Sequence, residues 1–121
     1  MKGWIYFAVN PSLKGLIKIG FTERDPLKRV SELSNTSIPY KFELIYSTLV
    51  ERADEVEFHL HCELDKFRTS ASREFFECDP IQAIKSLVKT LDYLQVYVLY
   101  EEKNFEDMDI QKTTDPNRNS L

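Results

Sequence analysis

The chain has 121 residues, 42% of them hydrophobic, which is enough for one compact core and excludes an arrangement of several large domains. Two cysteines, Cys62 and Cys78, are too few for a disulfide framework, and neither belongs to a CxxC pair or a zinc pattern. No apolar run approaches the roughly 20 residues that cross a bilayer, and no signal segment opens the chain, so we expect a soluble cytoplasmic protein.

The net charge of −4 argues against tight nonspecific binding to nucleic acid, because such affinity grows with the number of neutralised phosphates. The charge is uneven, however. Residues 1–50 contain seven Lys or Arg and four Asp or Glu, giving +3, whereas residues 101–121 contain three and six, giving −3. Any nucleic-acid contact is therefore expected in the amino-terminal part, with weak and steeply salt-dependent affinity.

The first two predicted elements form a β-hairpin. Residues 3–9 and 16–21 are aromatic and β-branched, and the residues between them are rich in turn formers. Because side chains alternate across a strand, Ile17, Ile19 and Phe21 form an apolar row that points at the core.

Tyr6 and Lys18 then lie on the opposite face of the hairpin. Gly20, which has no side chain, leaves space beside Lys18 for a ligand or a backbone. On these two runs alone, an ordinary half-buried hairpin with a solvated lysine is the simpler interpretation. The functional one is that a phenol and an ammonium belong to a site that cleaves phosphodiesters.

Helical patterns follow the hairpin. Asp25-Pro26 is a capped helix start, and Leu27, Val30 and Leu33 mark its buried stripe. Residues 52–67 have apolar side chains at three- and four-residue spacing and predict a second helix. Asp79-Pro80 begins a third helix, whose inward side chains are Ile81, Ile84, Leu87, Val88 and Leu91.

Between the first two helices, residues 42–50 predict a third strand, antiparallel to one hairpin strand and with side chains that alternate. Residues 96–100 predict a short extra strand, and the acidic composition from Glu101 onward predicts a poorly packed tail, disordered after about residue 112. The expected class is α+β: a small three-stranded antiparallel sheet flanked by about three helices, with a polar carboxy-terminal tail. We expect a domain over residues 1–95 and an extension over 96–121.

An ordered set of short motifs runs through the chain. Gly3-Trp4-Ile5-Tyr6 is followed by Lys18-Ile19-Gly20-Phe21-Thr22, and the set ends with Arg73-Glu74-Phe75-Phe76. Over roughly residues 3–93 the chain resembles the GIY-YIG nuclease superfamily, in particular its phage-associated branch, whose second motif begins with lysine. Trp4 occupies the glycine position of the first motif, which puts substrate access in question, and Lys18 occupies the tyrosine position of the second.

The resemblance implies a role for each of five residues. Tyr6 would be the general base that takes a proton from water, which requires its pKa to fall by roughly 2 to 3 units from about 10. Lys18 would lower that pKa or orient the water. Glu74 would hold Mg²⁺ or Mn²⁺ together with several water ligands. Arg29 and His61 would stabilise the phosphate, with His61 also a candidate proton acceptor.

Each assignment has an ordinary structural alternative. Arg29 also fits a solvated helix arginine, and Glu77 has the same chemistry as Glu74. His61 has Glu57 and Asp65 four residues to either side, a spacing that suits pairing on a helix surface.

Two further residues are weaker candidates for contacts with the substrate. Thr22 would offer a hydroxyl to a phosphate and Arg24 a guanidinium.

The expected function is a divalent-metal-dependent endonuclease that hydrolyses DNA phosphodiester bonds in one step with a tyrosine-activated water. The alternative is a noncatalytic module of the same fold that binds nucleic acid or protein, and RNA in place of DNA also stays open. No zinc finger, helix-turn-helix or basic arm is evident, so a homodimer or a separate partner would have to supply targeting.

Overall fold

The computed structural model describes residues 1–34, 40–69 and 74–105, and in these residues the chain forms five strands, three α-helices and one 3₁₀ helix. In chain order the elements are β1 (Gly3–Val9), β2 (Ile17–Thr22), α1 (Pro26–Glu32), β3 (Glu43–Val50), α2 (Ala53–Glu63), η1 (Asp65–Phe67), β4 (Phe75–Phe76), α3 (Pro80–Leu94) and β5 (Val98–Lys103).

The strands form one antiparallel sheet in the order β4-β2-β1-β3-β5. The predicted α+β class and the hairpin are confirmed, but the predicted count of three strands is wrong. β4 is only two residues long, too short for an alternating pattern. The short extra strand predicted over residues 96–100 is partly confirmed. It is β5, which starts at Val98 and continues through Glu101 to Lys103, residues that the acidic composition assigned to a tail. Its partner β3 holds it in place, although every residue of β5 is exposed.

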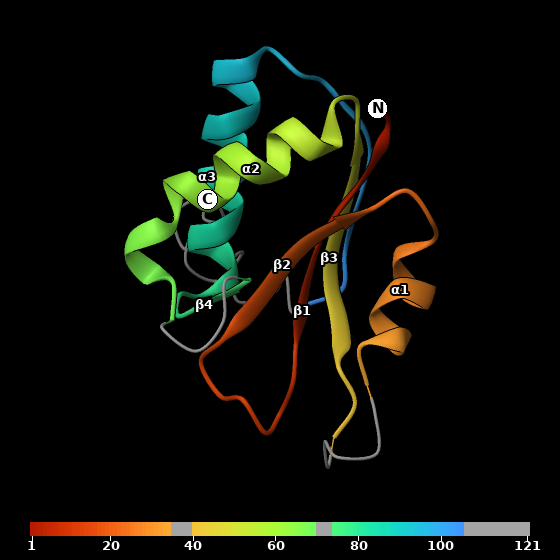
Figure 1. Ribbon diagram of the computed structural model, residues 1–121, viewed down its shortest axis with the longest axis vertical. Coiled ribbons are helices and arrows are strands. Elements are labelled where there is room, and N and C mark those ends of the chain that lie inside the picture. The colour runs from red at the N-terminus through yellow and green to blue at the C-terminus, as the bar shows by residue number, and fades with distance from the viewer. Residues whose placement is uncertain (35–39, 70–73, 106–121) are drawn as a thin grey trace, which may run out of the picture.

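The two faces of the sheet carry separate clusters, with α2 and α3 on one side of the strands and α1 on the other (Figure 1). The main core lies under α2 and α3 and contains the predicted apolar row of the hairpin, with Ile17 and Ile19 buried and Phe21 partly buried. The smaller cluster lies under α1 and consists of Tyr6, Ala8, Val30 and Leu44, with Leu33 and Phe42 packed against it.

A register shift interrupts β3 where it pairs with β1. Phe7 pairs with Tyr46 and Ala8 with Leu44, so Ile45 is the extra residue of a bulge. Ile45 and Tyr46 both join the main core. The predicted strict alternation along residues 42–50 therefore fails beyond Leu44.

Both predicted helix starts are confirmed. The Asp25 carboxylate accepts a hydrogen bond from the Leu27 amide at 3.0 Å, and the Asp79 carboxylate accepts one from the Gln82 amide at 2.9 Å. The predicted buried stripes are only partly correct. Leu27 is 63% exposed, because the short helix α1 contacts the sheet through Pro26 and Val30.

Helix α3 is likewise rotated from the expected face. Val88 is 59% exposed and Ile81 38%, whereas the small and polar residues Ala83, Ser86 and Thr90 are buried. The helix packs against α2, and small side chains allow two helices to approach closely.

The end of the described chain joins the same core. Val96 lies in the main cluster and Phe105 packs against it, so the residues after α3 extend the sheet. Residues 106–121, which contain most of the predicted tail, lie outside the described residues. Within the described ranges, no helix has both the length and the apolar character that a membrane crossing requires.

Candidate active site

The position of the Tyr6 ring depends on a glycine in the neighbouring strand. Tyr6 of β1 pairs with Gly20 of β2, and a Cβ on Gly20 would lie 2.7 Å from the Tyr6 hydroxyl oxygen and 2.8 Å from Cζ. The ring therefore extends from β1 across the backbone of β2. Gly20 does leave space, as predicted, but Tyr6 fills it rather than a ligand.

The Tyr6 side chain is buried, with 1% of the residue exposed, in the small cluster under α1. Burial raises the pKa of its phenol above 10, while the charge and a side-chain hydrogen bond of Arg29 oppose this and the carboxylates of Glu74 and Glu57 add to it. The predicted lowering of this pKa by Lys18 is therefore wrong. The cation that acts on Tyr6 is Arg29, which α1 brings over this face of the sheet.

Lys18 has a different partner. Its ammonium forms an ion pair with the Glu74 carboxylate and lies 5.5 Å from the centre of the Phe75 ring. The pairing of β2 with β4 brings the two side chains together. Lys18 pairs with Phe75, the residue after Glu74, and the Glu74 carbonyl accepts a hydrogen bond from the Ile19 amide at 3.0 Å. The Lys18 side chain is 11% exposed and that of Glu74 47%.

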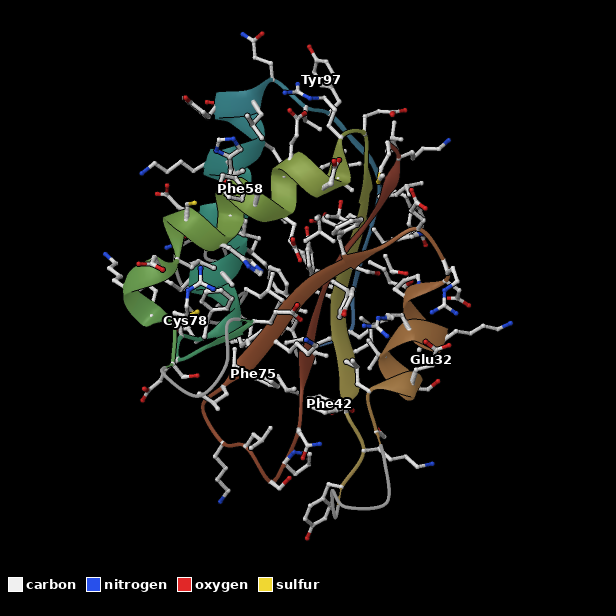
Figure 2. The ribbon with its side chains drawn as sticks, in the orientation of Figure 1. Glu32, Phe42, Phe58, Phe75, Cys78 and Tyr97 are labelled. Carbon is white, nitrogen blue, oxygen red and sulfur yellow. The ribbon has the colours of Figure 1, made fainter. Side chains whose placement is uncertain are left out.

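Aromatic side chains support this end of the site. The rings of Phe75 and Phe42 lie 6.1 Å apart and are seen together near the ends of the strands in Figure 2. Glu74 directly precedes the two residues of β4, so its backbone is held at the edge of the sheet. Arg73, the residue before it in the predicted motif, lies outside the described residues.

His61 of α2 lies where β4 stops covering the edge of β2. Its Nε2 is 2.9 Å from the Ile19 carbonyl oxygen and 3.8 Å from Glu57 Oε2, and its ring packs against Phe76 at 5.0 Å between centres. Burial lowers the pKa of His61, a change that the Ile19 hydrogen bond opposes. Of the two acids spaced four residues from His61, only Glu57 lies near it; Asp65 instead pairs with Arg68 at 2.9 Å.

A cavity of about 390 Å³ lies at this edge of the sheet. Its lining residues are Glu57, Phe58, His61, Cys62, Arg68 and Glu74. Burial, with a further contribution from the charge of Glu74, raises the pKa of Glu57 to about 7, while Lys18 acts in the opposite direction. Two of these residues, Glu57 and Arg68, are not among the predicted site residues. The sequence feature that points to Glu57 is its four-residue spacing from His61.

The two weaker candidates are not brought to this cavity. The Arg24 guanidinium makes two hydrogen bonds to Glu32, at 2.9 and 2.7 Å, on the exposed side of α1, where Figure 2 labels Glu32. The Thr22 hydroxyl is buried and accepts a hydrogen bond from the Arg24 amide at 3.1 Å, so it stabilises the turn after β2. Arg29 lies 3.6 Å from the same Glu32 carboxylate.

Trp4, at the glycine position of the first motif, lies on the Tyr6 face of β1. Its ring packs edge-on against Tyr100 of β5, with 5.9 Å between centres. Trp4 is not among the residues that line the cavity next to Glu74, so it does not close that cavity.

The donor set suits a weakly held hard cation. In the described part of the chain, no group of three or more His, Cys, Asp or Glu is arranged to enclose a metal ion. Mg²⁺ is often bound through one or two carboxylates while it keeps most of its water ligands, and the half-exposed Glu74 beside a cavity of about 390 Å³ fits that mode, because the cavity has room for a hydrated ion. The Lys18 ammonium shares this carboxylate, so a metal ion would have to bind beside it or displace it.

Comparison with known proteins identifies the family. The T5orf172 domain matches residues 3–92, which is about three quarters of the chain. No curated protein and no solved structure gives a significant match. The chain therefore belongs to the T5orf172 domain family, a phage-associated family often linked to nuclease-like modules.

Proposed function

We propose that the protein is a divalent-metal-dependent endonuclease of the GIY-YIG type, which hydrolyses DNA phosphodiester bonds in one step with water. The observation that carries the proposal is the convergence of Lys18, His61 and Glu74 at the open edge of β2, with Tyr6 and Arg29 acting on each other across the adjacent face. These residues come from separate segments of the chain. Membership of a family linked to nuclease-like modules supports the same reaction class.

Each residue has a role that follows from its chemistry. Glu74 would hold Mg²⁺ or Mn²⁺, and the bound ion would polarise a phosphoryl oxygen and offset the charge that develops in the transition state. Arg29 can donate two hydrogen bonds to phosphate oxygens. Lys18 orients the Glu74 carboxylate and adds positive charge beside it. With its pKa raised, Tyr6 is a neutral phenol near pH 7, and its buried hydroxyl would act by positioning the Arg29 guanidinium.

A plasmid-nicking assay tests the proposal. Wild type is compared with Glu74→Gln and with Glu77→Gln, a matched control three residues further along, each with Mg²⁺ or Mn²⁺ and with a chelator. We expect Glu74→Gln to lose about 100-fold or more of the activity, Glu77→Gln to keep it, and the chelator to abolish it. Equal nicking by the two variants would show that Glu74 has no such role.

The noncatalytic module is the second candidate, and one observation favours it: the Lys18 ammonium already partners the carboxylate that would bind metal. Such a module would shift labelled DNA or RNA in a gel at low salt yet cleave neither with any divalent metal. Running both nucleic acids in the same assay also identifies the preferred substrate.

A further inference from the structure

We propose that His61 is the proton acceptor for the attacking water, and that the Ile19 carbonyl and the Glu57 carboxylate position its ring. This inference rests on the proposed nuclease function and chooses His61 over Tyr6, the two proton acceptors that the resemblance allows. It also gives Glu57, to which no role has been assigned, a positioning role through His61.

The hydrogen bond to Ile19 determines which ring nitrogen can act. A carbonyl oxygen only accepts hydrogen bonds, so His61 Nε2, at 2.9 Å from it, must carry the hydrogen. In the neutral ring, Nδ1 then has the free electron pair. A base whose other nitrogen is fixed by a third group is a recurrent arrangement in enzymes, because it settles both tautomer and ring orientation.

Access to water distinguishes His61 from Tyr6. His61 lines the cavity that also borders Glu74, and 14% of its side chain is exposed. Tyr6 is 1% exposed and does not line that cavity. A water beside the Glu74 carboxylate therefore shares a cavity with the imidazole.

The protonation states agree with this geometry. Burial keeps the pKa of His61 below its ordinary value of 6.5, so the ring is mainly neutral at pH 7 and able to accept a proton. Burial moves the pKa of Tyr6 upward from 10, so less than about one phenol in a thousand is ionised at that pH.

The charged groups around His61 come from several elements. Arg68, after η1, and Lys18, on β2, disfavour the protonated ring, whereas Glu74, before β4, favours it. Glu57, one turn earlier on α2, lies 3.8 Å from Nε2. Because burial raises its pKa to about 7, its carboxylate stabilises the imidazolium only at and above that pH, where it is ionised.

The step balances as follows. The water oxygen forms the new bond to phosphorus, and one water proton moves to His61 Nδ1. The bond from phosphorus to the leaving oxygen breaks, and that oxygen keeps the electron pair and takes a proton from solvent water. His61 afterwards releases its proton to solvent.

The kinetic test measures cleavage of a labelled DNA duplex with Mg²⁺ as a function of pH, for wild type, His61→Gln, Glu57→Gln and the control His59→Gln. His59 lies on the same helix but packs against Tyr93 and does not line the cavity. We expect the wild-type rate to rise with pH through an inflection below 6.5. His61→Gln should lose this inflection and about 100-fold or more of the rate, and His59→Gln should keep both.

Burial raises the pKa of Glu57 to about 7, so Glu57 is mostly uncharged at the His61 inflection, and Glu57→Gln should leave that inflection in place. The variant should instead lose rate above pH 7, where the ionised carboxylate stabilises the imidazolium. A Glu57→Gln enzyme with the wild-type rate above pH 7 would overturn its positioning role.

A second measurement needs no variant. Long-range ¹H–¹⁵N spectra of the metal-free wild type should show the neutral His61 ring protonated at Nε2. A ring protonated at Nδ1 would overturn the inference, as would a His61→Gln enzyme that keeps the wild-type rate and inflection while Glu74→Gln is inactive. If wild type cleaves no nucleic acid with either metal, the proposed function fails and this inference with it.

Discussion

Replacing Gly20 by alanine tests the packing that positions Tyr6. The new Cβ would lie 2.7 Å from the Tyr6 hydroxyl oxygen and 2.8 Å from Cζ, which is closer than real Cβ atoms come to other atoms. It would also lie 3.1 Å from Cε2, a distance shorter than most Cβ contacts. The ring cannot move aside freely, because Val30 and Leu44 enclose it. Overpacking of this kind costs about 1 to 3 kcal/mol, from which the better strand propensity of alanine recovers about 0.5 to 1 kcal/mol. The middle values of these two ranges give a net loss of about 1 kcal/mol.

Urea unfolding of a double-mutant cycle measures this loss. In a Tyr6→Leu background the ring is gone, so Gly20→Ala should become neutral or slightly stabilising, which gives a coupling of about 1 to 3 kcal/mol between the two sites. An equal effect of Gly20→Ala in both backgrounds would show that the ring does not lie across Gly20. Full wild-type stability of the single variant would refute the reasoning in the same way.

Three further predictions concern single side chains. Because the folded-state pKa of Glu57, about 7, exceeds its ordinary value of 4.5, its stabilising contribution is full below pH 4.5 and is lost as the pH rises through 7. Glu57→Gln should remove this decline, at most about 3 kcal/mol, from urea midpoints measured over that range, and parallel profiles for the two proteins would contradict it. Asp79→Ala should cost about 0.5 to 2 kcal/mol in thermal unfolding because α3 loses its cap, whereas Asp79→Asn should keep most of the stability; equal losses would argue against capping. Burial and the neighbouring Asp79 raise the pKa of Cys78 to about 11, which leaves little reactive thiolate at pH 8. We therefore expect the Cys78 thiol of a Cys62→Ser variant to react with a thiol reagent at pH 8 at least about 10-fold more slowly than the exposed Cys62 thiol of a Cys78→Ser variant. Similar rates for the two variants would count against a buried Cys78.

Local patterns account for the parts of the fold that the sequence predicts. The hairpin, the third strand and the two capped helix starts at Asp25 and Asp79 depend on side-chain alternation and on residues close in sequence. β4 and the charged end of β5 depend on distant partners, β2 and β3, whose hydrogen bonds no local pattern shows; only the apolar start of β5 is predicted from the sequence. The bulge at Ile45 likewise arises from pairing and breaks the regular alternation.

The candidate site divides in the same way. The residue types and their order point to Lys18, His61 and Glu74, and the structure brings these three to one edge of the sheet. Sequence cannot say which cation neighbours which acid or phenol. That choice depends on α1 placing Arg29 over Tyr6, which leaves Lys18 to Glu74.

Strand β5 has a consequence for the solution behaviour of the protein. It is one of the two edge strands of the sheet, and its neighbour within the sheet is β3, whose residues are mostly buried. The charged side chains of Glu101, Glu102 and Lys103 discourage another chain from adding to this border, a common protection against intermolecular strand addition. A chain shortened to the family match, ending at residue 92, would lack β5 and expose the edge of β3 to solvent. We expect such a chain to aggregate by pairing of exposed β3 edges.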